Sequence, residues 1–262
     1  KVPASWDTAL GQVAEKFSAA IDTYGADSVA FYVSGQLLTE DYYVANKLMK
    51  GYIGSANIDT NSRLCMASSV AGHKRAFGSD TVPQTYEDLE EADLIVLVGS
   101  NLAWCHPVLF QRIMEAKKTR PNMRIINIDP RRTATSEFSD MHLNIAPDGD
   151  IALFNGLLAY IADHGAQNNV YINAYINGYA NAVATARLSN PADTGLSPVE
   201  LEAFYTAWTG TEKVVTLYSQ GVNQSSCGSD KVNAILNCHL ATGRIGKPGC
   251  GPLSATGQPN AM

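Results

Sequence analysis

The chain has 262 residues, of which 45% are hydrophobic and 17% are charged, and its formal net charge is −6 with a pI near 5.3. This size and composition are typical of an ordinary soluble globular protein that forms one large domain or two small ones. Since a nucleic-acid partner requires a basic face and the sequence has no Lys/Arg run, the charge argues against nucleic-acid binding.

Membrane and disulfide patterns are also missing. No stretch reaches the roughly 18 apolar residues of a membrane span, and residues 1–18 do not have the layout of a signal peptide, so no membrane partner is expected. The five cysteines are an odd number without CxxC spacing. This pattern favours a reducing compartment and argues against a zinc ribbon or an iron–sulfur cluster within these residues. Any metal would rest on single protein ligands.

The first part of the chain alternates helix and strand patterns. Apolar residues at three- and four-residue steps predict a helix over residues 6–21, and a strand is expected at 28–33. A polar turn, Ser34-Gly35-Gln36, follows that strand directly. Further helical patterns cover residues 38–52 and 62–77, and the second carries Cys65 near its start.

The clearest strands are the apolar runs at 94–98 and 124–128, with a helix expected between Pro107 and Pro121. This unit of about 35 residues has the usual size of a right-handed crossover. A short strand at 142–145, helices at 151–163, 171–179 and 198–208, a strand at 214–218 and a helix at 227–241 follow. The alternation predicts an α/β fold with a doubly wound, mainly parallel, Rossmann-like sheet. The tail from residue 243 shows no periodicity.

Polar turns follow four of the expected strands, at residues 34–36, 99–101, 129–132 and 220–224. Open parallel sheets bind ligands outside these strand ends. Glycines there permit close backbone approach, amides can read a base or a pterin, and Asp129 could accept from ribose or guanine. A nucleotide-like ligand is one interpretation, and ordinary turn formation is the other. The absence of GxGxxG and GxxxxGK[ST] excludes the usual NAD fingerprint and the P-loop.

Cys65 is the one cysteine in a position that suggests chemistry. The expected helix start and the neighbouring Arg63 would favour its thiolate, a soft ligand that suits a thiophilic metal. On spacing alone, a lone cysteine near a helix start is more often a small core residue. The other cysteines and the five histidines show no partner pattern, and the absence of GxSxG gives hydrolase chemistry no support.

The residues around Cys65, Asn61-Ser62-Arg63-Leu64-Cys65-Met66-Ala67-Ser68-Ser69-Val70, resemble the segment that supplies molybdenum's cysteine in nitrate reductases of the bis-molybdopterin guanine dinucleotide family. The resemblance continues, in order, over nearly the whole chain. It includes Val98-Gly99-Ser100-Asn101 with His106-Pro107, Ile128-Asp129-Pro130-Arg131, Gly221-Val222-Asn223-Gln224, and residues 242–249 and 257–259. The assimilatory, cytoplasmic branch of the molybdopterin oxidoreductases fits best.

The resemblance implies that Cys65 is the protein ligand of molybdenum, whose other sulfurs come from two pterins, and that Met66 faces the substrate cavity. The implied reaction is two-electron oxygen-atom abstraction from nitrate to give nitrite, with electrons from a donor protein or subunit. Positions that match cofactor-binding residues of the family are Gln36, Asn61, Gly99, Ser100, Asn101, Asp129, Arg131, Asp150, Gln220 and Gln224.

Members of the family are longer, with an N-terminal [4Fe-4S] segment and a Gly-Gly-Arg-Glu segment that this sequence lacks. The chain is therefore expected to be an internal fragment that folds but neither holds the full cofactor nor reduces nitrate. Residues 63–240 should form the Rossmann-like domain, inserted in a second, incomplete α/β domain built from residues 1–62 and 241–262. Apolar surface left uncovered there could promote dimers.

Two alternatives remain open. A formate dehydrogenase-like molybdoenzyme typically has His after the metal-binding residue, whereas this sequence has Met66. A non-catalytic subunit with the molybdopterin fold need not keep the ligand cysteine, whereas Cys65 stands here in its full motif.

Overall fold

The computed structural model describes residues 2–255, apart from the side chains at positions 62 and 63. The described residues divide between Leu64 and Cys65 into two compact units, each of which is described by itself. The motif at 257–259 lies outside the described residues. Both units combine helices with parallel strands, which confirms the expected α/β class. No helix in the described part of the chain has the length and apolar character needed to cross a bilayer.

The first unit is small and has a two-stranded parallel sheet, in which Phe31 pairs with Ile58. Ser5 caps the first helix by accepting from the backbone N–H of Thr8, as expected for a residue just before a helix. That helix buries none of its residues, and its apolar side chains, such as Trp6 at 82% exposure, remain open. The elements of the first unit are α1 (Trp6–Tyr24), the 3-10 helix η1 (Ala26–Ser28), β1 (Phe31–Val33), α2 (Thr39–Asn46), the π-helical η2 (Lys47–Ile53), β2 (Ile58–Thr60) and the one-turn α3 (Ser62–Cys65), whose last residue opens the second unit.

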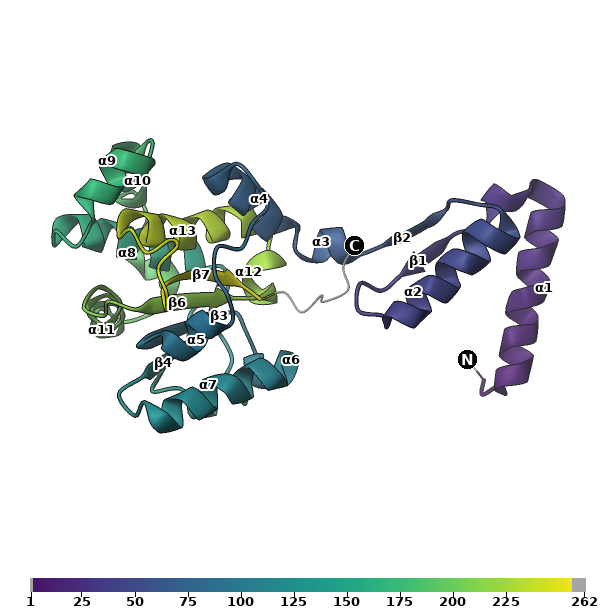
Figure 1. Ribbon diagram of the computed structural model, residues 1–262, viewed down its shortest axis with the longest axis horizontal. Helices are drawn as coiled ribbons and strands as arrows, with labels where there is room; N and C mark the ends of the chain where they lie inside the picture. Colours follow the sequence, from purple (N-terminus) through teal and green to yellow (C-terminus); the bar gives the residue numbers. More distant parts are fainter. Residues whose placement is uncertain (1, 256–262) are drawn as a thin grey trace. The chain divides into compact units, whose positions relative to one another are not determined.

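The second unit has a five-stranded, fully parallel sheet in the order β5-β4-β3-β6-β7 (Figure 1). Its strands are β3 (Leu94–Val98), β4 (Arg124–Ile128), β5 (Met141–Leu143), β6 (Val214–Tyr218) and β7 (Gly251–Ser254). From β3 the chain first builds outward through β4 and β5, and then returns to the other side of β3 with β6. The order therefore reverses between β3 and β6, the place where open α/β sheets bind ligands.

Helices cover both faces of this sheet, because successive side chains of a strand point to opposite faces. Val96 packs on one side with α8 (Asp150–Asp163) and α13 (Gly228–Ala241), while Ile95 packs on the other side with α5 (Glu87–Glu91) and α7 (Pro107–Thr119) (Figure 1). The helices of this unit are α4 (Ala67–Phe77), α5 (Glu87–Glu91), α6 (Leu102–Cys105), α7 (Pro107–Thr119), α8 (Asp150–Asp163), α9 (Asn169–Tyr175), α10 (Tyr179–Ala186), α11 (Pro198–Thr209), α12 (Gln220–Asn223) and α13 (Gly228–Ala241), with short 3-10 turns at Ser136–Phe138 and Pro191–Thr194.

Several expected elements differ from the structure. The helix expected at 171–179 is divided into α9 and α10, and the helix expected at 38–52 continues from α2 into the π-helical η2. The helix predicted over 62–77 breaks at Met66, whose φ of −121° and ψ of 16° are not helical, so Cys65 ends α3 and α4 begins at Ala67. The tail that showed no periodicity contains β7, which pairs with β6 through Thr216 and Pro252. Pairing with β7 closes the outer edge of β6, a strand that is buried along its whole length.

This pairing also corrects the expected division of the chain. Residues 241–255 belong to the second unit rather than to the first, because β7 is a strand of the larger sheet. The insertion of the larger unit into a second domain of a longer protein stays a prediction.

Candidate cofactor site at the carboxyl edge of the sheet

Two glycines bring the loops after β3 and β6 into direct contact. A Cβ atom on Gly99 would lie 2.7 Å from the Cα of Gly221, and one on Gly221 would lie 2.6 Å from the Cα of Gly99. Gly99 also has a φ of +54°, and the N–H of Gly221 donates to its carbonyl oxygen at 3.0 Å. Only glycine permits this approach, so the pair sets the separation of the two loops at the point where the strand order reverses.

Serines and an asparagine fix the loop after β3. Ser219 donates to the carbonyl oxygen of Ala255 at 2.5 Å, and its Oγ lies 3.0 Å from Ser100 Oγ. Asn101 accepts from Thr135 Oγ1 at 2.9 Å. Ser100 is 1% exposed, and the contact of its hydroxyl with Ser219 holds the loop in place. Asn101 is half-buried, and its Nδ2 makes no hydrogen bond to the described residues.

Asp129 follows β4 directly and stabilises its own turn. Its Oδ1 accepts from the backbone N–H of Arg131 at 2.8 Å, and the Arg131 guanidinium lies 3.9 Å away. The carboxylate is 7% exposed, while the arginine side chain is 78% exposed. The turn therefore presents a flexible cation to solvent at the edge of the sheet.

The sulfur of Cys65 contacts two side-chain amides from the segment that follows β6. Gln220 Nε2 lies 2.8 Å from Cys65 Sγ, and Gln224 Nε2 lies 3.4 Å from it. Both glutamines belong to the turn after β6, which places the half-buried thiol at the switch point. The expected location of Cys65 in the first turn of a long helix is wrong, because the chain leaves helical geometry at Met66.

A buried clamp positions the segment that carries Cys65. Asn223, which is 4% exposed, accepts through Oδ1 from the N–H of Ser69 at 2.9 Å and from its hydroxyl at 2.6 Å. Ser68 Oγ donates to the carbonyl oxygen of Asn223 at 2.7 Å. These bonds tie the start of α4 to α12. The sequence shows Asn223 inside a polar turn, but its role depends on contacts with residues more than 150 positions away.

Asp150 has a partner that the sequence did not indicate. Its carboxylate lies 2.7 Å from Lys231 Nζ, which also lies 2.8 Å from Asp148. The lysine side chain is 3% exposed. Burial lowers the pKa of Lys231, but hydrogen bonds and charges from the two carboxylates outweigh it and raise that pKa. The carboxylate of Asp150 thus takes part in an ion pair that fixes the start of α8.

The first unit has its own polar strand ends. Asn61, directly after β2, accepts from the backbone N–H of Gly35 at 2.6 Å, and the N–H of Gln36 lies 3.2 Å from Ser34 Oγ. Because β1 and β2 are parallel, Gln36 and Asn61 lie at the same edge of this small sheet.

The residues that gather at the switch point of the larger sheet are therefore Cys65, Gly99, Ser100, Gln220 and Gln224. Asn101 lies in the same loop after β3, and Asp129 follows the adjacent strand β4. Within the described residues, no group of three or more His, Cys, Asp or Glu side chains could hold a metal. A single soft sulfur, amide donors and closely packed glycine loops fit a cofactor that brings most of its own metal ligands.

A doubly wound parallel sheet with such a site defines an α/β cofactor-binding protein. The family model described as molybdopterin oxidoreductase matches residues 2–260. The chain belongs to the molybdopterin oxidoreductase family, which confirms the resemblance found in the sequence.

The similar proteins include nitrate reductases. The nitrate reductase of Klebsiella oxytoca is 54% identical over 99% of this chain and 30% of its own length. That of Shewanella frigidimarina is 52% identical over 100% of this chain and 28% of its own length. The chain thus spans less than a third of either relative. Acetylene hydratase from Pelobacter acetylenicus has a similar fold, with a TM-score of 0.62, 20% identity, and coverage of 92% of this chain and 33% of its own.

The expected cytoplasmic location is contradicted. A relative from Desulfovibrio desulfuricans, 40% identical over 99% of this chain and 36% of its own length, is a periplasmic nitrate reductase. The expectation failed because cysteine spacing and cofactor loops report the fold and the site, and these features do not depend on the compartment.

Proposed function

We propose that the whole protein that contains this segment reduces nitrate to nitrite at a molybdenum held by Cys65. The observation that carries this proposal is the position of the Cys65 sulfur, 2.8 Å from Gln220 Nε2 at the switch point of a molybdopterin oxidoreductase sheet. Relatives that are nitrate reductases, aligned over 99% and 100% of the chain, support the choice of substrate.

When bound, a molybdenum-bis(molybdopterin guanine dinucleotide) would supply the two-electron oxygen-atom abstraction. In this proposal the chain itself provides one metal ligand and positions that ligand. Cys65 offers one soft sulfur, Gln220 and Gln224 orient that sulfur, and the Asn223 clamp holds its segment. Half-buried Met66 would line the substrate cavity and limit the access of water.

The strand-end loops would hold the pterin and guanosine parts. Asn101 has an Nδ2 donor without a recorded bond among the described residues, and Arg131 has an exposed guanidinium suited to phosphate. The remaining proposed contacts are Gln36, Asn61, Gly99, Ser100, Asp129, Asp150, Gln220 and Gln224. For Asp150 the contact would run through the ion pair with Lys231.

The test compares two cysteine variants of the full-length protein. Cys65→Ser should abolish viologen-linked nitrate reduction, because a hydroxyl is a poor ligand for a thiophilic metal. Cys105→Ser, at an exposed cysteine, should retain activity. Formate oxidation without nitrate reduction would favour the formate dehydrogenase alternative. Met66 argues against that alternative, because such enzymes typically have His at this position. Purified protein without molybdenum or either activity would favour a non-catalytic subunit.

We further propose that the 262-residue chain alone is inactive. It covers 28% to 37% of the relatives, so a [4Fe-4S] cluster, the contacts of the electron donor and much of the cofactor enclosure would come from other parts of the protein. Elemental analysis and a viologen assay of the purified chain test this. Stoichiometric molybdenum together with nitrate reduction would contradict it.

The isolated chain is also proposed to dimerise through its uncovered apolar side chains. Trp6, Leu10 and Val13 of α1 are 82%, 60% and 55% exposed, respectively. Size-exclusion chromatography with light scattering should show a dimer that Leu10→Glu dissociates. A monomer at all concentrations would contradict the proposal.

A further inference from the structure

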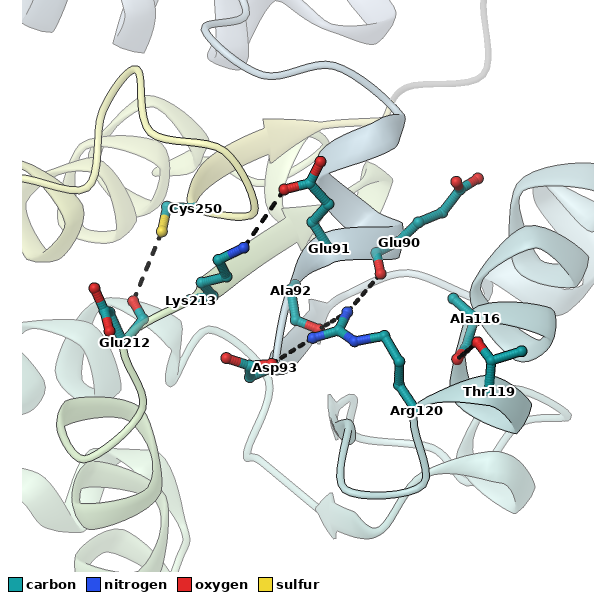
Figure 2. Close-up of polar contacts among 10 residues, drawn as sticks. All are labelled: Glu90, Glu91, Ala92, Asp93, Ala116, Thr119, Arg120, Glu212, Lys213 and Cys250. Atoms are coloured by element: carbon teal, nitrogen blue, oxygen red, sulfur yellow. Dashed lines mark hydrogen bonds and ion pairs between the residues drawn. The ribbon is translucent and has the colours of Figure 1, made fainter.

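A cavity of about 560 Å³ lies at the opposite edge of the larger sheet from the candidate cofactor site. Its walls are the turn that leads into β6 and the loop that leads from α13 into β7. Figure 2 shows Glu212 and Lys213 of the turn close to Cys250 of the loop, with Cys250 Sγ 3.7 Å from the carbonyl oxygen of Glu212. Both segments precede strands, so the cavity belongs to the amino edge.

Arg244 lines this cavity and is 7% exposed. Its guanidinium stacks 4.0 Å from the ring centroid of Trp208. Nη2 donates to the carbonyl oxygens of Thr211 at 2.5 Å and Trp208 at 3.2 Å, whereas buried Nη1 has no hydrogen-bond partner within the described residues. Burial lowers the pKa of Arg244 to about 10, so the side chain remains a cation at neutral pH.

No carboxylate lies within ion-pair distance of Arg244 in the described part of the chain. A buried cation without a contacting carboxylate is costly in a folded protein, and the charge of Glu212 offsets this cost only in part, since the pKa of Arg244 remains lowered. A native structure tolerates such a group when a ligand or an ion completes it. Nη1 itself is closed off from the cavity, so an anion in the adjoining cavity would offset the charge of Arg244 without bonding to Nη1.

The other charged residues of the cavity have the same preference. Lys247 is exposed and has no ion pair in the described residues, and Lys213 lies 3.5 Å from Glu91 (Figure 2). Glu212 is the only carboxylate among the lining residues of this cavity, while Arg244 and Lys247 are lining cations without an ion pair in the described residues. The cavity is thus a positive site on a chain whose net charge is −6.

Three threonines also line the cavity but do not offer free donors. The hydroxyls of Thr209, Thr211 and Thr242 donate to helix carbonyl oxygens at 2.7, 2.7 and 2.9 Å, respectively. Recognition of a ligand must therefore come from the cationic side chains. The positive charge of the guanidinium and of the two flanking ammonium groups matches the negative charge of a phosphate group.

We propose that this cavity binds a phosphate group, either as free phosphate or as part of a small phosphate monoester. Its volume lies within the usual range of small-molecule sites, roughly 300–1,000 Å³. This inference is independent of the nitrate reductase proposal, because the cavity lies at the other edge of the sheet and none of its lining residues was assigned to the cofactor.

Calorimetric titration of the 262-residue chain with inorganic phosphate at low ionic strength tests the proposal. We expect saturable binding that weakens about 10-fold in the double variant Lys213→Gln/Lys247→Gln. The exposed Lys118, paired with Glu115, gives the matched control Lys118→Gln, which should bind as the unchanged chain does. Circular dichroism checks that each variant is folded.

Arg244→Lys should also weaken binding, but this variant loses bonds to two carbonyl oxygens and could lose stability, so the lysine variants carry the test. Absence of binding at millimolar phosphate, or equal binding by the double variant and the Lys118 control, would overturn the proposal. Titrations with AMP and with adenosine identify the source. Tighter binding of AMP than of phosphate, without binding of adenosine, indicates a monoester, and binding of phosphate alone indicates the free ion.

Discussion

Gln220 Nε2 lies 2.8 Å from Cys65 Sγ, although 155 positions separate the two residues in the chain. The contact forms because Cys65 precedes α4 and Gln220 begins α12, and the Asn223 clamp holds these two helices together. The candidate metal ligand is thus oriented by residues that follow β6 in the chain.

Gln220→Ala in the full-length protein should lower molybdenum occupancy or nitrate reduction by about 10-fold, since partners that orient a metal ligand typically contribute 10- to 100-fold. Gln224→Ala is the matched comparison, and its effect should be smaller because its amide lies 3.4 Å from the sulfur. Metal analysis and steady-state kinetics measure both variants. Equal activity of Gln220→Ala and the unchanged protein would show that the contact does not position Cys65.

Gly221→Ala should destabilise the chain by about 1–3 kcal/mol, because the new Cβ would overpack the backbone of Gly99. That Cβ would lie only 2.6 Å from Gly99 Cα. Gly11→Ala serves as the control, since a Cβ there meets nothing within 4 Å and alanine is the better helix former. Urea unfolding should place the two variants on opposite sides of the unchanged chain. A neutral Gly221→Ala would mean that the two loops can separate.

Lys231→Met should lower the unfolding free energy by about 3 kcal/mol, because it leaves the buried carboxylate of Asp150 without its partner. Lys118→Met, which removes an exposed ion pair, should change stability by less than about 1 kcal/mol. Chemical denaturation at pH 7 compares them. Equal effects of the two substitutions would show that the Lys231 cluster is not a structural element.

The same cluster predicts a pH dependence at both ends of the scale. Because the pKa of Lys231 is raised in the folded chain, the ion pairs of Lys231 stabilise the fold fully below pH 10.5. This stabilisation is lost as pH rises through the pKa of the folded state. Hydrogen bonds from Lys231 and Ser225 lower the pKa of Asp148, so the ionised carboxylate of Asp148 stabilises the fold above pH 3.8. This stabilisation is lost as pH falls through the pKa of the folded state. Unfolding curves of Lys231→Met should lack the alkaline loss and show a smaller acid loss, because the hydrogen bond from Ser225 to Asp148 remains. Unchanged losses in this variant would assign them to other groups.

His239 predicts a further loss of stability in mild acid. Burial lowers its pKa well below 6.5, and its Nε2 lies 2.8 Å from Thr216 Oγ1. The unfolded chain therefore binds a proton that the folded chain does not, so stability falls as pH falls below 6.5. Denaturation at pH 7.5 and 5.5 should show a smaller difference for His239→Gln than for the unchanged chain. An identical difference would show that other groups cause the loss.

Much of the central sheet could be predicted from the sequence. The strands at 94–98, 124–128 and 214–218 agree with the expected residues, because strands covered on both faces have unbroken apolar runs. The turns after them were found for a similar reason, since polar residues and glycines stand where the apolar runs stop. Local pattern thus determined the α/β class and the loops in which a ligand would bind.

Other features were decided by tertiary structure. β7 is formed by a Gly/Pro-containing segment whose strand character comes from pairing with β6, and Lys231 lies on a helical pattern that does not reveal its burial between Asp148 and Asp150. The orientation of Cys65 by Gln220 likewise depends on a contact across 155 positions. The sequence by itself determined which segments are strands and where their polar ends fall. Pairing at the sheet edge, burial of charge and long-range contacts required the folded chain, because they depend on which distant groups meet.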